Sequence, residues 1–455
     1  MKFIYADSMD YVDPGYDFLA DRHAERRSPY WDDQYPHEIL GYAPYDGILV
    51  SRGIVGDHRV SGKYSEAQAM RFRRVGVRTF LRLDEPRFAG LQIFGDCGAF
   101  TYHQEEVPPY SPEDMVAFYD EGGFTHGCSV DHIIFDFDQN LTGLNGGSDE
   151  ARRRFEITLA NAEDFLPASH RLSNRFTPLG VVQGWSPGSM AEAARRLVRM
   201  GYGYLAIGGT VPLKASQIKL LLAAIREVVP SSIRLHILGF AKADEIASFL
   251  PFRIASFDTT SPLLRAFKDA KRNYYLARPD GSLAYYTAIR VPQALENTKL
   301  LRLVKQGTFR QEDLVALEQE ALALLRAYNR GEAGLEETLD ATLAYGTPAI
   351  LGMPLHQAVR TKALGELRAR YHRTLSDRPW QRCRCAVCQA ISIEVIIFRA
   401  SNRNKRRGIH NIGVYKTLVD SLPEADAYHD QANLFRAPRP AEPESHGAVV
   451  RSKCR

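Results

Sequence analysis

Short apolar runs rich in β-branched residues recur through the first 260 residues, and helix-like segments separate most of them. Two of these segments, residues 190–200 and 216–229, carry apolar residues at helical spacing. Buried strands that alternate with helices form parallel sheets. Eight runs predict an α/β fold of the TIM (β/α)8 barrel type, and no Gly-x-Gly-x-x-Gly follows an early run to favour an open doubly wound sheet. The runs span residues 47–51, 79–83, 92–96, 132–136, 179–184, 204–209, 235–240 and 254–258.

Polar residues or glycines stand at the end of five of these runs. TIM-barrel enzymes carry their catalytic groups at the C-terminal ends of the strands. A single aspartate at such a place is more often the N-cap of the next helix, but five run ends of one kind predict an active site on this face. The residues are Asp96, Asp136, Gln183 with Gly184, Gly208 with Gly209, and Asp258.

Three cysteines crowd into the segment RCRCAVC, and a histidine follows at a distance of 22 residues. Three thiolates and one imidazole suit Zn²⁺, and four protein ligands leave no open position for chemistry. The spacing therefore predicts one structural zinc ion, in preference to a disulfide or an iron–sulfur cluster. The expected ligands are Cys383, Cys385, Cys388 and His410.

The positive charge of the chain is concentrated near these cysteines. From residue 381 onward there are 13 Lys and Arg against 7 Asp and Glu, a net charge of +6 in a chain whose total is +4. Such a region indicates either a polyanionic partner or a solvated surface. We expect nucleic-acid phosphates to bind Arg403, Lys405, Arg406 and Arg407.

The chain divides into parts of different character. Residues 312–328, 335–345 and 361–375 follow long helical patterns, whereas the last twenty residues are rich in proline and polar side chains. We expect a barrel with an N-terminal extension over 1–292, a helical insertion over 293–375, a zinc-binding subdomain over 376–435 and a disordered basic tail over 436–455.

Composition excludes several classes of protein. Six cysteines in 455 residues are too few for a secreted disulfide scaffold. The N-terminus is too acidic and too broken for a signal peptide, and no uncharged apolar run approaches the length of a membrane span. We therefore expect a cytoplasmic protein with no membrane partner.

The motif CRCAVC followed by GIHNIGVY resembles the zinc motif of the queuine/archaeosine tRNA-guanine transglycosylases. Further segments resemble motifs of that superfamily in the same order, and the N-terminal region and the helical insertion are similar to its DpdA-type branch. That branch inserts 7-deazaguanines into DNA. The matching segments are FGDCGAF, HIIFDFD, GVVQG, LAIGGTVPL, HILGF and ASFDTTSP.

The resemblance implies a base exchange at C1′ of a nucleoside, which is chemically similar to retaining glycoside hydrolysis. Asp258 matches the family nucleophile, and Asp96 matches the general acid/base. Asp136 is expected to read the N1–H and 2-amino edge of guanine, and Gln183 its other edge or the 7-substituent. The backbone amides of two glycines are expected to approach the base; these are Gly208 and Gly209.

The resemblance also implies the partners. The incoming base is expected to be free preQ0, because GGTVPL is similar to the preQ0-using type. DNA is the expected substrate, and its target nucleotide must leave the helix to reach a barrel mouth. The helical insertion is expected to contact DNA or a companion protein of the same modification system. Two alternatives remain: a tRNA-guanine transglycosylase, and a non-catalytic zinc-containing subunit that binds nucleic acid.

Overall fold

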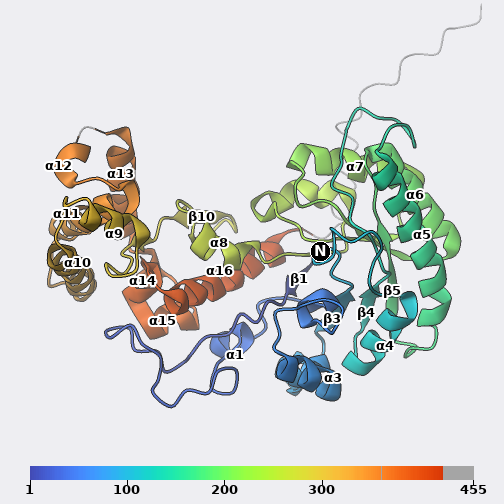
Figure 1. Ribbon diagram of the computed structural model, residues 1–455, viewed down its shortest axis with the longest axis horizontal. Helices are drawn as coiled ribbons and strands as arrows, with labels where there is room; N and C mark the ends of the chain where they lie inside the picture. The colour runs from blue at the N-terminus through green and yellow to red at the C-terminus, as the bar shows by residue number, and fades with distance from the viewer. Residues whose placement is uncertain (360, 424–455) are drawn as a thin grey trace, which may run out of the picture.

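The computed structural model describes residues 1–359 and 361–423, and its centre is a closed barrel of eight parallel strands (Figure 1). Strands that are neighbours in sequence are neighbours in the barrel, and β1 pairs with β8 to close it. This confirms the predicted TIM-barrel fold. The strands are β1 (Lys2–Ala6), β2 (Gly47–Ser51), β3 (Gln92–Asp96), β4 (His126–Cys128), β5 (Thr177–Val182), β6 (Tyr204–Ile207), β7 (Arg234–Ile237) and β8 (Ser256–Asp258).

Two of the eight apolar runs are not barrel strands, and two strands lie outside the runs. Residues 79–83 form the end of helix α3 and the turn after it, and residues 132–136 lie in the loop after β4. Both runs are apolar because most of their apolar side chains are buried, although neither run forms a strand. The missed strands are β1, at the very start of the chain, and β4, whose three residues include a histidine and a glycine.

Helices surround the barrel, and serines begin several of them on the face where the strands end. The hydroxyls of Ser65, Ser111, Ser148 and Ser186 each accept a hydrogen bond from the amide three residues later, which satisfies a donor that the first helical turn leaves free. The surrounding helices are α3 (Glu66–Phe80), α4 (Pro112–Gly122), α5 (Asp149–Ser169), α6 (Pro187–Met200), α7 (Ala215–Val228), the 3-10 helix η2 (Ala243–Phe252) and α8 (Ser261–Lys268), with two short helices, α1 (Pro36–Leu40) and α2 (Arg52–Val55), and the 3-10 turn η1 (Pro86–Phe88) before β3.

A hairpin and a group of helices follow the barrel. Strands β9 (Tyr274–Ala277) and β10 (Leu283–Tyr286) pair antiparallel, and β11 (Ile289–Arg290) pairs with β12 (Ile397–Phe398). The three helical patterns recognised in the sequence correspond to α10, α11 and α13. The helices are α9 (Thr298–Lys305), α10 (Gln311–Arg330), α11 (Leu335–Gly346), the π-helical turn η3 (Thr347–Leu351), α12 (Leu355–Ala358), α13 (Lys362–Asp377), α14 (Pro379–Arg382), α15 (Ala386–Ile391), η4 (Ser392–Ile396) and α16 (Ser401–Ser421).

Helices α9 to α13 lie in the range expected for the helical insertion and are called the inserted helices below. They share one hydrophobic core with the cysteine segment, and this core is separate from the core of the barrel. Helix α16 connects the two cores: Ile409 belongs to the first, whereas Ile412 and Tyr415 belong to the core of the barrel. Figure 1 shows α16 running from the helical region toward the barrel. The cysteine segment is therefore fixed in position relative to the barrel.

Within the described ranges, no helix is both long enough and apolar enough to cross a membrane. The tail expected at 436–455 lies outside the described residues, as does Cys454.

Candidate active site and metal centre

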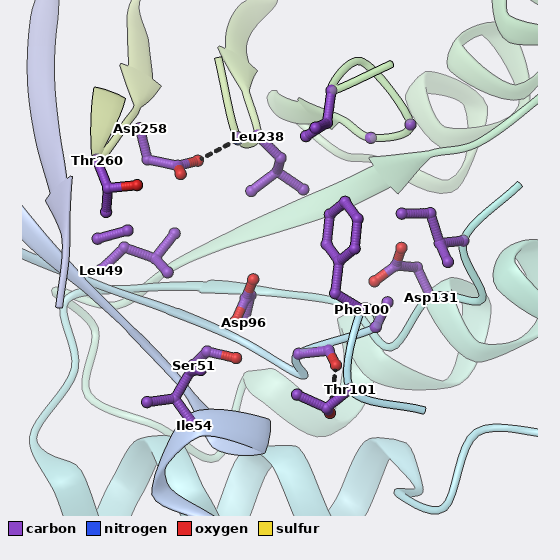
Figure 2. A pocket seen from close by; sticks show the side chains of 18 of the residues that line it. Leu49, Ser51, Ile54, Asp96, Phe100, Thr101, Asp131, Leu238, Asp258 and Thr260 are labelled. Carbon is purple, nitrogen blue, oxygen red and sulfur yellow. Dashed lines mark hydrogen bonds between the residues drawn. The ribbon is translucent and has the colours of Figure 1, made fainter. Parts of the chain in front are cut away.

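A pocket lies at the C-terminal ends of the barrel strands. It brings together five residues that the sequence placed at the ends of four different runs (Figure 2). The carboxyl groups of Asp96 and Asp258 line the same cavity from β3 and β8, and the ring of Phe100 lies on the side of the cavity that Asp131 occupies. The five residues are Asp96, Gln183, Gly208, Gly209 and Asp258.

Asp258 is buried and held by two N–H donors. Its Oδ1 accepts a hydrogen bond from the amide of Gly239 at 3.0 Å and lies 3.2 Å from Nε2 of His236. On the other side of the ring, Nδ1 of His236 lies 2.5 Å from the hydroxyl of Ser256, which lies 2.6 Å from that of Tyr204.

The distances allow one continuous series of hydrogen bonds. When Asp258 is ionised and His236 is neutral, Nε2 of His236 donates to the carboxylate and Nδ1 accepts from Ser256, whose oxygen then accepts from Tyr204. All three side chains are buried inside the barrel, and the His236 ring stacks on Phe94 with centroids 5.0 Å apart. These contacts hold the carboxyl group of Asp258 in a fixed orientation at the pocket. The sequence did not indicate this series of hydrogen bonds, because its members lie on three different strands.

Asp96 occupies a different electrostatic environment. Burial, followed by the nearby charges of Asp258 and Asp131, raises its pKa from 3.8 to about 7, against the lowering effect of the Ser51 hydroxyl and the Gly98 amide. Its Oδ1 is excluded from solvent and has no hydrogen-bond partner among the described residues. Asp96 can therefore exist as an acid or as a base near neutral pH, which suits proton transfer.

A third carboxyl group in the pocket belongs to Asp131, whereas the sequence predicted Asp136. Asp131 lines the pocket, where its carboxylate accepts hydrogen bonds from Nε2 of Gln183 at 2.7 Å and from Sγ of Cys97 at 3.1 Å. Burial raises the pKa of Asp131. Asp136, which the sequence suggested for this role, lies exposed outside the pocket and accepts a hydrogen bond from Ser148 at 2.8 Å. The reason is that β4 ends at residue 128, so position 131, and not 136, lies at the barrel mouth.

The two glycines after β6 make room for the neighbouring side chains. A Cβ on Gly208 would lie 2.3 Å from Nε2 of Gln183, and Gly209 has a φ of +69° that disfavours any other residue. The amide of Gly208 already donates to the carbonyl of Val182 at 2.9 Å. Gly208 therefore shapes the wall of the pocket, and its amide is not free to bind a base as the sequence suggested.

A fourth carboxyl group, Asp7, also lines the pocket and was missed. Burial, followed by the charge of Asp10, raises the pKa of Asp7 to about 6, and the hydroxyl of Tyr64 donates to it at 2.9 Å. The sequence contained a usable signal, because KFIYAD is an apolar run that ends near an aspartate, like those before Asp96 and Asp258.

The predicted metal ligands converge. One ligand atom from each of Cys383, Cys385, Cys388 and His410 lies within 4.8 Å of the others. The three sulfurs lie 3.6, 3.3 and 3.4 Å from Nδ1 of His410. Metal–sulfur and metal–nitrogen bonds of the usual zinc lengths, arranged tetrahedrally, separate sulfur from nitrogen by about 3.6 Å. The cluster can thus hold a metal ion.

Neighbouring groups fix the orientation of the histidine. Nε2 of His410 donates to the carbonyl of Tyr275 at 2.7 Å, which leaves Nδ1 free for the metal. The ring of Tyr274 stacks on the imidazole with centroids 4.2 Å apart, and its hydroxyl lies 3.2 Å from Sγ of Cys388. The metal centre is therefore built into the base of the β9–β10 hairpin.

The predicted phosphate-binding residues of α16 are not on the surface. Arg403, Arg406 and Arg407 are buried, and Lys405 is partly buried. The prediction that these four side chains face nucleic acid is wrong, because α16 lies between α8, η4 and the segment that follows β1. Their donors bind acceptors within the protein, among them the Glu394 carboxylate (2.8 Å from Nε of Arg403) and the carbonyls of Tyr11 (3.3 Å, Lys405), Asp13 (2.9 Å, Arg406) and Ala266 (3.2 Å, Arg407).

No protein-family model matches this chain. A curated protein of Salmonella montevideo described as "DNA-guanine transglycosylase" is 42% identical over 425 residues, which cover 93% of this chain and 97% of the relative. The match therefore extends over nearly the whole length of both proteins. Together with the TIM barrel and its cluster of strand-end carboxylates, it shows that the chain belongs to the family of DNA-guanine transglycosylases.

Proposed function

We propose that the protein exchanges guanine in DNA for a 7-deazaguanine base, and that Asp258 forms a covalent bond to the nucleoside during the reaction. One observation carries this proposal. A carboxylate held by two N–H donors, Asp258, and a carboxyl group whose pKa is about 7, Asp96, line one pocket at the mouth of a barrel. Retaining glycosyl transfer uses two carboxyl groups in different environments, one as the nucleophile and one as the general acid/base.

In the first step, the carboxylate of Asp258 attacks C1′ of the target deoxynucleoside. The bond from C1′ to N9 of guanine breaks, and its electron pair stays on the base. Asp96, in its protonated form, delivers a proton to the departing guanine, which leaves as a neutral molecule. A sugar ester of Asp258 and an ionised Asp96 remain.

The second step reverses the roles of these groups. Asp96 accepts the N9 proton of the incoming base, and N9 attacks C1′ and expels the Asp258 carboxylate. Asp96 ends the cycle protonated, so no net proton is consumed. A pKa of about 7 supports this double role, because both forms are populated at neutral pH.

We assign guanine recognition to Asp131 and Gln183, in place of the residue suggested by sequence. An ionised carboxylate accepts from the N1–H and 2-amino donors of guanine, an edge that adenine lacks. Gln183 donates to Asp131 at 2.7 Å and thereby fixes its orientation. The base must leave the DNA stack to reach this pocket.

We infer that the incoming base is preQ0. The apolar side chains of Val211 and Leu238 line the pocket, and they suit a small uncharged nitrile. Asp7 is the acidic group that could instead receive a cationic aminomethyl substituent, although its carboxylate already accepts from Tyr64. A preference for the aminomethyl base over preQ0 in the exchange assay would reassign Asp7 to that substituent.

The metal of the Cys3His cluster is proposed to be one zinc ion with a structural role. Three cysteines and a histidine complete a tetrahedral site and leave no position for water or substrate. The ion would stabilise the link between the inserted helices and the β9–β10 hairpin.

The test supplies full-length protein with labelled preQ0 and either duplex DNA, single-stranded DNA or tRNA. We expect incorporation into DNA, and a protein–DNA adduct that survives denaturation when the incoming base is withheld. Asp258→Asn should abolish both signals, whereas the matched control Asp164→Asn, an exposed carboxyl on α5, should retain them. Incorporation into tRNA alone, or full exchange by Asp258→Asn, would contradict the proposal.

A further inference from the structure

A second cavity, outside the active site, is bounded by cationic side chains. It opens between the β9–β10 hairpin and α13. Lys271, Arg272 and Arg278 come from the hairpin and the segment before it, and Arg370 and Arg373 come from α13. No carboxylate belongs to the lining that the structure describes. We call this cavity with its five cations the basic groove.

The donors of the basic groove are largely free. Three of the five cations have a carboxylate nearby: Arg272 lies 3.7 Å from Asp244, Arg370 lies 3.5 Å from Glu366 and Arg373 lies 3.8 Å from Asp377, distances beyond those of well-formed hydrogen bonds. The Nε of Arg370 is buried and has no hydrogen-bond acceptor within the described ranges. Arg407, in contrast, directs its guanidinium at backbone carbonyls inside the protein. The groove therefore has hydrogen-bonding capacity that the fold itself does not use.

Two tyrosines hold guanidinium groups at the rim of the basic groove. Arg272 lies over the ring of Tyr285 with its Cζ 5.7 Å from the centroid, and Arg373 lies over Tyr286 at 4.9 Å. A ring face restrains a guanidinium through cation–π attraction without occupying its N–H groups. The planar fork of such an arginine stays available for a phosphate, which it binds through two hydrogen bonds.

The basic groove lies close to the active site along the chain. Helix α8 begins three residues after Asp258, and five residues separate its end from the hairpin, so Lys271 lies 13 positions after Asp258. With eight of them helical, the two residues lie within about 30 Å. One strand of duplex DNA carries a phosphate every ~3.4 Å, so this span corresponds to about nine nucleotides. Figure 1 shows α8 and β10 between the barrel and the inserted helices.

We propose that the basic groove binds the phosphate backbone of the DNA that flanks the guanine being exchanged. The inference rests on the proposed function, because it takes DNA as the substrate. It gives the inserted helices a role, since α13 supplies one wall. It also places the phosphate contacts on the hairpin and α13, in place of the buried arginines of α16.

The experiment replaces three exposed cations of the groove by glutamine in the full-length protein: Lys271→Gln, Arg278→Gln and Arg373→Gln. Binding of a fluorescent duplex of about 40 base pairs, longer than the span above, is measured against salt concentration. We expect the dissociation constant to rise about tenfold or more near physiological salt. The slope of log affinity against log salt should become shallower by about 2 to 3, at ~0.9 for each lost phosphate contact. The kcat at saturating DNA should not change.

The matched control removes three exposed cations from the opposite end of the barrel: Arg171→Gln, Arg175→Gln and Arg199→Gln. These residues follow or end α5 and α6, away from the pocket. If the wild type exchanges bases in DNA but the two triple variants show equal salt slopes, the basic groove does not bind DNA. The proposed function would then still stand. No exchange on DNA by the wild type would refute the proposed function itself. Equal melting temperatures and equal metal content verify that both variants are folded.

Discussion

Replacing Asp96 by asparagine should raise the stability of the protein while it destroys activity. Asparagine has nearly the shape of aspartate and no charge. In the native protein, burial and two neighbouring carboxylates raise the pKa of Asp96 from 3.8 to about 7. Between these values the native state retains a proton that the unfolded chain has released. Stability therefore falls as pH rises through this window and becomes flat above it.

The size of the stability difference follows from the change in the pKa of Asp96. About three pKa units at ~1.36 kcal/mol each amount to about 4 kcal/mol for the fully ionised group. Asp96→Asn should therefore match the wild type near pH 4 and exceed its free energy of unfolding by up to about 4 kcal/mol near pH 8. Exchange activity should fall by about 10² to 10⁴, the usual contribution of a proton-transferring group.

Urea unfolding at several pH values, followed by tryptophan fluorescence, measures the stability difference, and base exchange measures the activity. Asp164→Asn, an exposed substitution of the same type on α5, serves as control and should show no widening gap with pH. A variant that lost stability at pH 8, or whose stability difference did not depend on pH, would refute the assignment of Asp96 as a buried group with a raised pKa.

Three further predictions concern residues outside the pocket lining. His236→Phe keeps the ring that stacks on Phe94 but removes the donor to Asp258; kcat should fall about 10- to 100-fold, as expected for a lost hydrogen bond to a charged group, with an unchanged KM for DNA. An unaltered kcat would exclude a positioning role. Cys385→Ser should lower the zinc content measured by elemental analysis and reduce the melting temperature, and full occupancy would contradict the ligand assignment. Arg403→Met removes one of the two arginines that pair with each of Asp21 and Glu394, which keep Arg399 and Arg326, and should cost about 1.5 to 3 kcal/mol in urea unfolding; lost DNA affinity at unchanged stability would reverse this expectation.

The fold could be predicted from the sequence because most strands of a parallel barrel are buried on both sides and appear as continuous apolar runs. That same rule explains two of the differences between the predicted and the observed strands. Strand β4 contains only His, Gly and Cys, and the histidine is accommodated because it stacks on Phe94 inside the barrel, with centroids 4.3 Å apart. The run at 132–136 is apolar because Ile133 and Ile134 are buried although they lie in a loop. Hydrophobicity records burial, and burial alone does not distinguish a strand from a covered loop.

The wrongly predicted strands also led to wrongly predicted pocket residues. A strand over residues 132–136 would place Asp136 at its C-terminal end, which is why the sequence indicates this residue for guanine recognition. The true end of β4 places Asp131 in the pocket, and recognising β1 would have added Asp7. Asp96 and Asp258 were found because their strands end directly at the carboxyl-bearing residue. The hydrogen-bonded chain behind Asp258 could not be predicted, since it requires the spatial order of β6, β7 and β8.

The basic segment of α16 illustrates why charge in a sequence does not identify a nucleic-acid surface. A run of arginines is compatible with solvent, with phosphates or with buried carboxylates. The choice depends on partners that are distant in the chain. Arg403 pairs with Asp21, 382 residues away, and with Glu394. The cations of the basic groove are spread over about a hundred residues and form no run, yet they share one cavity without an acidic lining residue in the described chain. For this protein, we therefore base the proposed DNA path on free donors that share one cavity, and not on consecutive charges in the sequence.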